Sequence, residues 1–451
     1  MDTLEPGSAP SETTAVPTPA PAGRDSKTGE GGPKKPRTIW QCLGPGLVTG
    51  ASDDDPSGIA TYSQAGAQFG YGLAWTLILT YPLMAAIQEI SARIGRVTGH
   101  GIAGNLRRHY PPLTINAIVF LLVAANVINI GADLGAMGAA LGLLIGGPQW
   151  LYVLLFGGAS AALQILVPYC RYVSILKWLT LSLFAYVATV LVVPIPWAEL
   201  GHAVIHPPVS LKSEYLVAVV AVFGTTISPY LFFWQADQEV EEEKGDPEAQ
   251  PLKKAPEQAP EELRRIRLDT YIGMLLSNGV ALFIIITTAA TLHVHGVTDI
   301  QTSSQAAEAL RPIAGTFAFA VFALGIIGTG LLALPVLAGS AAYALGEARR
   351  WPVGLARPWD KAKAFYGAIL LAMAVGSVMN VIDMDPVKAL FWSAVVNGLV
   401  AVPVIVMMMR MATKREIMGD FVLPPVLRVL GWVCMAAMAV VDTAMVVTWV
   451  I

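Results

Sequence analysis

Three consecutive carboxylates interrupt the first long apolar segment of the chain. Asp53, Asp54 and Asp55 are followed directly by Pro56, and Gly58 comes two residues later. A charged side chain inside a membrane costs a few kcal/mol, so these acids require a partner there. Proline and glycine break the helix, which frees backbone carbonyls that must line a cavity or bind something. Carboxylates and freed carbonyls together offer only oxygen, the ligand of hard cations.

A second apolar segment, at 214–236, carries a similar interruption without the acids. In its middle Ser228 stands directly before Pro229, and Thr225 lies three residues before Ser228. Two interrupted segments five spans apart predict two inverted five-helix repeats, with a substrate held where the breaks meet. The competing interpretation is a pair of proline kinks that serve packing alone.

The composition predicts an all-α polytopic membrane protein. Of the 451 residues 55% are apolar and only 14% are charged, well outside the range of soluble domains. A net charge of −3 argues against a nucleic-acid partner. Three scattered cysteines argue against a disulfide framework or a cysteine-rich metal site.

Apolar runs predict about eleven transmembrane helices, of which helices 1 and 6 are broken. The spans are expected near 44–69, 71–95, 114–143, 149–168, 173–195, 214–236, 270–292, 314–345, 364–382, 387–410 and 425–450. Residues 1–38 read as a disordered cytosolic tail because they lack hydrophobic periodicity. The expected organisation is helices 1–5 in 39–195, helices 6–10 in 214–412 with a solvated cytosolic loop at 237–268, and helix 11 in 423–451.

The basic residues predict the orientation. With the N-terminus in the cytosol, 26 of the 29 Lys and Arg residues fall on cytosolic segments, as the positive-inside rule requires. Lys212, Arg311 and Lys388 remain outside. A multi-pass protein of the plasma or inner membrane with an external C-terminus follows.

Several motifs resemble the Nramp family of divalent-metal transporters. They are Gly-Pro-Gly at 44–46, Asp55-Pro56, Gln-Ala-Gly-Ala-Gln-Phe-Gly-Tyr at 64–71 and Arg-Ile-Gly-Arg-Val-Thr-Gly at 93–99. The resemblance implies a LeuT-type fold with helices 1–5 and 6–10 as inverted repeats. It also implies that Asp55 is the metal-binding aspartate.

The departures from that family are informative. Its first break reads Asp-Pro-Gly-Asn with a metal-binding asparagine, where this chain has Gly58. Its sixth helix carries Met-Pro-His, where this chain has Ser228-Pro229-Tyr230, and a later histidine is Gln235 here. Its third-helix Asp-Leu-Ala-Glu becomes Asp133-Leu-Gly-Ala. This pattern is similar to the branch of Nramp-related magnesium transporters.

Ligand chemistry favours the same branch. A thioether prefers transition metals, so replacing methionine by serine leaves oxygens and, with Gly58, more room. Mg²⁺ is usually held by one or two carboxylates and retained waters. We therefore expect a partly hydrated Mg²⁺, and also Mn²⁺, to pass by alternating access. The candidate metal ligands are Asp55, Ser52, Gly58, Thr225, Ser228, Asp54, Tyr230 and Asn397.

The missing titratable groups predict uncoupled transport. A proton relay needs a chain of Asp, Glu or His through the membrane, and Asp133 is a solitary acid in the third span. We expect a facilitator driven by the ion gradient and membrane potential, with no cofactor and no obligate protein partner beyond the bilayer. The alternative is a proton-coupled Mn²⁺ or Fe²⁺ transporter of the ordinary Nramp type.

Two further classes compete less well with this interpretation. An amino-acid carrier would need a helix N-terminus free of anions for its substrate carboxylate, which Asp53 to Asp55 oppose. An intramembrane aspartyl protease would need two carboxylates at close range, and no companion motif supports that role. We therefore expect that this protein is not an enzyme.

Some polar residues have open or structural roles. Asp53 and Asp54 either lend charge to the site or cap the broken helix, and Asn397 either faces the site or packs. Asn126 and Asn129 are expected to hold helices together.

Overall fold

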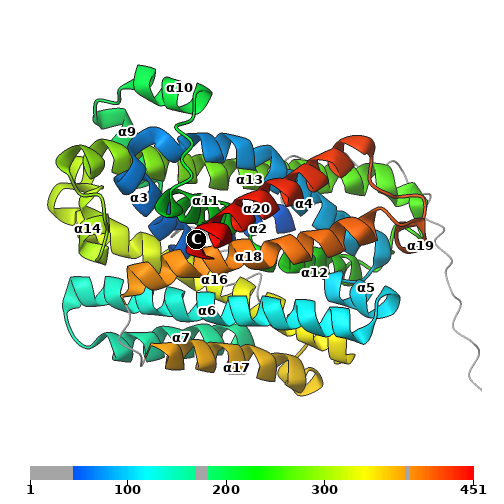
Figure 1. Cartoon of the computed structure of the whole chain (residues 1–451). Coiled ribbons are helices and arrows are strands. Elements are labelled where there is room, and N and C mark those ends of the chain that lie inside the picture. Colours follow the sequence, from blue (N-terminus) through cyan, green and yellow to red (C-terminus); the bar gives the residue numbers. More distant parts are fainter. Residues whose placement is uncertain (1–43, 168–180, 182, 381–384, 451) are drawn as a thin grey trace, which may run out of the picture. The chain divides into compact units, whose positions relative to one another are not determined.

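The fold is all-α in the described part of the chain. The structure, a computed structural model, describes residues 44–167, 181, 183–380 and 385–450 (Figure 1). The predicted tail at 1–38 and most of the first half of the predicted span at 173–195 lie outside these residues. The described residues form helices and contain no strand.

Long helices alternate with short connecting ones. In chain order they are α2 (Pro45–Asp53), α3 (Pro56–Phe69), η1 (Gly70–Leu73), α4 (Ala74–Thr98), α5 (Ile102–His109), α6 (Pro112–Ile145), α7 (Gln149–Leu166), α9 (Phe184–Val192), α10 (Trp197–Ile205), α11 (Ser213–Thr226), α12 (Pro229–Gly245), η3 (Pro256–Gln258), α13 (Ala259–Thr291), η4 (His293–His295), α14 (Ser303–Glu308), α15 (Arg311–Ala314), η5 (Gly315–Phe317), α16 (Ala318–Arg349), η6 (Trp359–Lys361), α17 (Lys363–Met379), α18 (Pro386–Ala412), α19 (Arg415–Met418) and α20 (Pro425–Val450).

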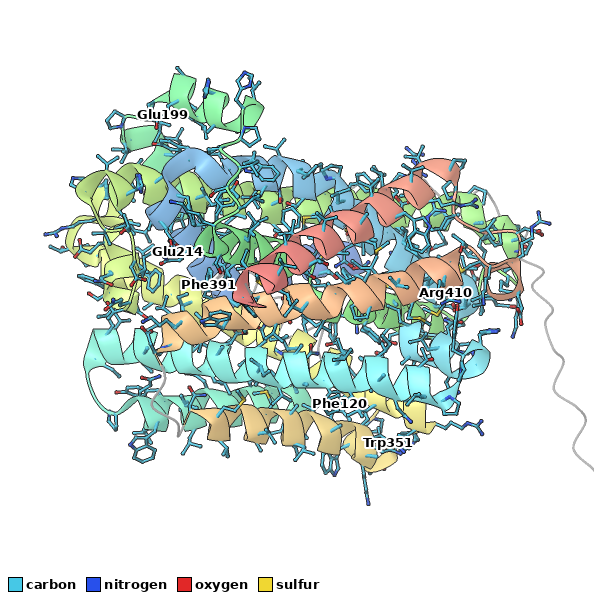
Figure 2. All side chains as sticks on the ribbon, viewed as in Figure 1. Phe120, Glu199, Glu214, Trp351, Phe391 and Arg410 are labelled. Atoms are coloured by element: carbon cyan, nitrogen blue, oxygen red, sulfur yellow. The ribbon has the colours of Figure 1, made fainter. Side chains whose placement is uncertain are left out.

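Eight of the described helical stretches are long and apolar enough to cross a membrane. The stretch 56–98 joins α3 and α4 through η1, and α17 is a shorter apolar helix. Large apolar side chains lie on the outer faces of these helices, as Phe120 on α6 does with 72% of its surface exposed (Figure 2). Such side chains require a lipid environment because they would otherwise contact water.

Both predicted helix breaks are present. The first interrupts the helix between α2 and α3 at Asp54 and Asp55, and the second separates α11 from α12 at Ile227 and Ser228. In each case a proline begins the following helix, where its missing N–H costs no hydrogen bond. The broken first and sixth spans are therefore confirmed as features of the fold.

Glycine backbones let α2 lie directly against α13. A Cβ at Gly46 would fall 2.7 Å from the backbone nitrogen of Thr270. A Cβ at Gly50 or at Gly273 would come even closer to the backbone of the other helix. At the start of α2, Asp269 of α13 accepts hydrogen bonds from the backbone nitrogens of Gly44 (2.8 Å) and Gly46 (2.5 Å). A carboxylate at a helix N-terminus satisfies free amides and favours the helix dipole.

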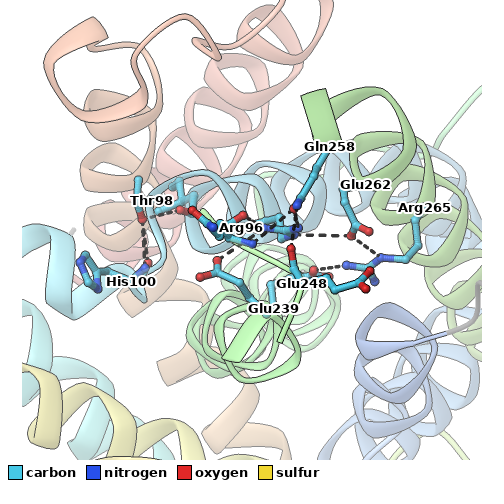
Figure 3. Close-up of polar contacts among 11 residues, drawn as sticks. Arg96, Thr98, His100, Glu239, Glu248, Gln258, Glu262 and Arg265 are labelled. Carbon is cyan, nitrogen blue, oxygen red and sulfur yellow. Dashed lines mark hydrogen bonds and ion pairs between the residues drawn. The ribbon is translucent and has the colours of Figure 1, made fainter. Parts of the chain in front are cut away.

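The end of the bundle at which α4, α12, α16 and α18 end and α13 and α20 begin is called the basic end below. Figure 2 shows Arg410 near this end and Glu214 near the opposite one. Its Arg96 and Arg265 are buried and pair with acids of α12 and α13 (Figure 3). The shortest of these pairs joins Arg265 to Glu239, whose carboxylate is fully buried, at 2.5 Å.

The segment 237–268 differs from the solvated loop that the sequence predicts. Helix α12 continues to Gly245 and α13 begins at Ala259, so only residues between them form a connection. The charged run becomes helical because Arg265 compensates the buried Glu239 and pairs with Glu242 at 3.0 Å. A run of charge in sequence does not reveal that its partners lie on a neighbouring helix.

Candidate functional site

Asp55 lies at the junction of the two halves of the first broken helix. It is the N-cap residue of α3, and its Oδ1 accepts a hydrogen bond of 2.7 Å from the backbone nitrogen of Gly58. Its Oδ2 accepts a hydrogen bond of 3.0 Å from Nδ2 of Asn129 on α6. With 2% of its surface exposed, this carboxylate is held by polar groups of two different helices.

The second break contributes Tyr230 to the same carboxylate. The Tyr230 hydroxyl lies 3.3 Å from Oδ2 of Asp55 and 3.2 Å from the backbone oxygen of Ser52. The structure therefore brings Ser52, Asp55 and Tyr230 together, although they lie 178 residues apart at the extremes. The freed carbonyl at Ser52 is one of the oxygens that the helix break was expected to supply.

The hydroxyls of the second break turn back on their own helix. The Ser228 hydroxyl donates to the backbone oxygens of Gly224 (2.7 Å) and Thr225 (2.8 Å). Thr225 and Ser228 are both at most 2% exposed. While it donates to these carbonyls, the Ser228 oxygen keeps its lone pairs for an ion, and the Thr225 carbonyl keeps one.

The space beside Gly58 is filled in this conformation. A Cβ at this glycine would lie 3.2 Å from Oγ1 of Thr225 and 3.3 Å from the backbone oxygen of Asp53. The expected extra room is thus occupied by Thr225 and by Tyr62, whose ring is also 3.3 Å away. The small residue allows the two breaks to approach each other closely.

Asp53 and Asp54 bond to α13 and do not cap α3. The hydroxyl of Ser277 donates to Oδ2 of Asp53 at 2.5 Å and lies 3.3 Å from Oδ1 of Asp54. Asp55 provides the cap. Asp54 is the C-cap residue of α2, and both roles left open for these acids, capping the broken helix and contributing charge, stay predictions.

Asn397 is buried in α18 and forms no hydrogen bond with Asp55 in the structure. It is 1% exposed, and its Oδ1 has no hydrogen-bond partner among the described residues. The same part of α18 packs on the second break, because a Cβ at Gly224 would contact Gly398. Its assignment as a metal ligand stays a prediction.

Asn126 and Asn129, both on the third span, have different roles. Asn126 donates to the Leu337 carbonyl (2.9 Å) and the Ser340 hydroxyl (2.8 Å) of α16, so its helix-holding role is confirmed. Asn129 instead donates to Asp55, a role that the sequence analysis missed. Its place one turn before Asp133, on the same helix face, is the signal that could have revealed it.

Asp133 lies one turn after Asn129 on α6 and is fully buried. Neither of its carboxylate oxygens has a hydrogen-bonding side chain within reach in the described residues. It lies near the Ser57 amide and within electrostatic range of Asp55. An acid in that position can take up a proton or a cation.

The arrangement suits a small hard cation more than a rigid metal cage. No three His, Cys, Asp or Glu side chains in the described residues are grouped closely enough to hold a metal ion by themselves. The groups that surround Asp55 are instead neutral amides, hydroxyls and carbonyls. A single carboxylate with neutral oxygens can hold a cation that keeps several waters.

Sequence comparisons find relatives of this chain. A family model described as Nramp, natural resistance-associated macrophage protein-like, matches residues 46–448. The divalent metal cation transporter MntH of Klebsiella pneumoniae strain 342 is 27% identical over 400 residues, which cover 87% of this chain and 91% of that protein.

Solved structures show the same fold. A crystal structure of the Eremococcus coleocola manganese transporter matches with a TM-score of 0.72 at 17% identity, covering 90% of this chain and 87% of that one. Mhp1, a nucleobase-cation-symport-1 family transporter, matches with a TM-score of 0.51 at 15% identity, covering 90% of this chain and 92% of its own. The LeuT-type fold predicted from the sequence is thus confirmed.

Proposed function

Because the chain belongs to the Nramp family, we propose that it is a multi-pass membrane protein that carries divalent metal cations across the bilayer. The relatives are named as transporters of divalent metal or manganese and not as enzymes, which sets the protease interpretation aside. The described spans provide the membrane part. The distribution of Lys and Arg residues supports a cytosolic N-terminus and an external C-terminus, with the basic end in the cytosol.

Within this class, the function that fits best is passage of a partly hydrated Mg²⁺, with Mn²⁺ as a second substrate. The observation that carries it is the set of groups around Asp55: Gly58 N, Asn129 Nδ2 and Tyr230 OH, beside the Ser52 carbonyl. The oxygens of Asp55, Tyr230 and Ser52 can bind an ion directly or through water, while Gly58 N and Asn129 Nδ2 orient the Asp55 carboxylate. Mg²⁺ accepts this environment because it loses its waters reluctantly.

Alternating access supplies the route. The site is buried in this conformation, with Ser52, Asp55 and Tyr230 at most 2% exposed. Since α2 and α11 end at the site and α3 and α12 begin there, movement of either half helix would open it to one side. The broken helices thus allow a small rearrangement to change access.

Uncoupled transport is part of the proposal, and the proton-coupled alternative rests on Asp133. Asp133 lies within electrostatic range of Asp55, so it could accept a proton when an ion displaces one. A relay through the membrane needs further titratable groups, and the positions of the relatives' histidines hold Tyr230 and Gln235 here. Facilitated passage driven by the gradient therefore fits better.

Substitution of Asp55 tests the proposal directly. Removing one charged partner of a desolvated contact costs about 2–5 kcal/mol, which is roughly 30- to 4,000-fold in affinity. Uptake of Mg²⁺ and Mn²⁺ into liposomes by Asp55→Ala should therefore fall to background, while protein yield and melting temperature report folding. Near-normal uptake by a folded variant would remove the site from this break.

A further inference from the structure

A polar cavity lies at the basic end and contains none of the candidate transport ligands. Its volume is about 220 Å³, and it is bounded by α12, α16 and residues 353–357. Its charged lining consists of Asp237, Glu241 and Lys244 of α12, Glu347 of α16, and Arg357. Three carboxylates thus face one cavity that the proposed transport does not use.

Asp237 is the residue that needs an explanation. It is 3% exposed, and its Oδ2 has no hydrogen-bond partner among the described residues. No Lys, Arg or His nitrogen of the described residues lies within ion-pair distance of the Asp237 or Glu347 carboxylate, and Lys244 acts on both only from farther away. A buried carboxylate without a partner is strongly unfavourable, so something must compensate it.

Glu347 lies next to Asp237. Both carboxylates approach the same glycine: a Cβ at Gly101 would lie 2.6 Å from Oε2 of Glu347 and would overlap Oδ1 of Asp237. Glu347 also accepts hydrogen bonds from the backbone nitrogens of Gly101 (2.9 Å) and Gly104 (2.7 Å). Two neighbouring acids repel each other unless a proton or a cation lies between them.

Glu241 is already engaged. Its Oε1 accepts a hydrogen bond of 2.6 Å from the Tyr343 hydroxyl, which itself accepts one from the backbone nitrogen of Leu355. This contact ties Glu241 to the wall of the cavity, whereas Asp237 and Glu347 approach each other and both keep free lone pairs for a ligand. Lys244 and Arg357 are exposed at its rim.

We propose that this cavity binds a divalent cation, held by Asp237 and Glu347 and by retained water. Mg²⁺ accepts one or two carboxylates with several waters, which is consistent with the absence of any three-acid metal group in the described residues. A volume of about 220 Å³ has room for the ion and a few waters, since a water occupies about 30 Å³.

The bound ion links three helices at the basic end. Asp237 belongs to α12, Glu347 belongs to α16, and Glu347 in turn holds the start of α5 through Gly101 and Gly104. Tyr230, which contacts Asp55, lies about two turns before Asp237 on the same helix. The ion therefore favours this position of α12, and a raised cation concentration at the basic end should slow transport.

Counting bound Mn²⁺ on the full-length protein tests the site. The loss of the sharp electron paramagnetic resonance signal of free Mn²⁺ measures binding at neutral pH, with Asp55→Ala as the background so that the transport site is removed. We expect one bound Mn²⁺ per chain, displaced by Mg²⁺, and at least tenfold weaker binding after addition of Asp237→Asn or Glu347→Gln. Asp246→Asn, which removes a carboxylate outside the cavity, should change nothing.

The outcomes separate this inference from the proposed function. Equal Mn²⁺ binding with and without Asp237→Asn, or no binding in the Asp55→Ala background because the two acids share a proton, would overturn the cavity site. Two bound ions in that background, one of them lost with Asp237→Asn, would keep the cavity site and refute Asp55 as the transport ligand. A Mn²⁺-induced rise in melting temperature that Asp237→Asn abolishes supports the site in a variant shown to be folded.

Discussion

Both helix breaks are followed by a proline that begins the next helix, but the first carries a carboxylate that accepts hydrogen bonds and the second a hydroxyl that donates them. In the first break Asp55 caps α3 and accepts hydrogen bonds from Asn129 and Tyr230. In the second break Ser228 donates to the carbonyls of its own helix. The first break thus provides a fixed negative charge, and the second provides neutral hydroxyl and carbonyl oxygens.

This difference assigns separate tasks to the breaks. A charge that other helices hold in place sets whether a cation binds at all, because its loss removes the main attraction. Neutral hydroxyls and carbonyls set which cation binds, because they replace some of its waters. Variants in the first break should therefore change affinity, and variants in the second should change selectivity.

The largest effect within this comparison is expected for Asn129→Leu. The substitution removes the amide that donates to Oδ2 of Asp55, and a hydrogen bond to a charged group contributes about 1.5–3 kcal/mol. Binding of Mn²⁺, measured by titration calorimetry, should weaken by roughly 10- to 100-fold. An unchanged affinity would show that Asn129 does not position Asp55.

A double substitution should change selectivity. Ser228→Met introduces a soft sulfur at the second break, and Gly58→Asn adds to the first break a side chain whose Cβ would lie 3.2 Å from Oγ1 of Thr225. We expect uptake of Mn²⁺ and Cd²⁺ to gain roughly tenfold over Mg²⁺ in liposomes, because thioethers favour transition metals. Mg²⁺ uptake unaffected by the change would contradict the account of ligand hardness and room.

Ser228→Ala should have a smaller effect. It removes the hydroxyl while leaving the backbone break and Asp55 in place, and one neutral hydrogen bond contributes about 0.5–1.5 kcal/mol. Mg²⁺ uptake at low concentration should fall by roughly 2- to 10-fold. A complete loss in a folded protein would mean that the second break supplies more than an adjustable ligand.

Asn126→Ala should leave cation affinity unchanged and lower stability instead. Asn126 bonds only to α16 in the described residues, three residues before Asn129. Loss of its bonds should destabilise the protein by about 1–3 kcal/mol, seen as a lower melting temperature. It is the matched control for Asn129, and a change in Mn²⁺ affinity equal to that of Asn129→Leu would erase the distinction between them.

The fold was predictable because its signals are local. Proline beside acids or hydroxyls within apolar runs marked both breaks, and apolar length marked the described spans. The ion pair between Glu89 and Arg93 of α4, at 2.7 Å, has an equally local origin. Four-residue spacing on one helix is sufficient to bring such side chains together.

The rest depended on contacts between distant segments. Nothing in the sequence near Asp55 shows that Asn129 donates to it, or that Ser277 takes up Asp53. The burial of Glu239 with Arg265 likewise needs the packing of α12 against α13. Sequence patterns identify which residues carry charge, whereas the partners that orient those charges come from tertiary structure.

The central claim is tested most directly by one liposome assay with an internal pH indicator. Purified protein is given Mg²⁺, Mn²⁺, Ca²⁺ or Cd²⁺ outside, and metal entry and internal pH are followed together. A site with oxygen ligands only, too few of them for Ca²⁺, and no proton relay predicts entry of Mg²⁺ and Mn²⁺, little Ca²⁺ or Cd²⁺, and a steady internal pH. Strong Cd²⁺ entry with no Mg²⁺ entry, accompanied by internal acidification, would contradict it.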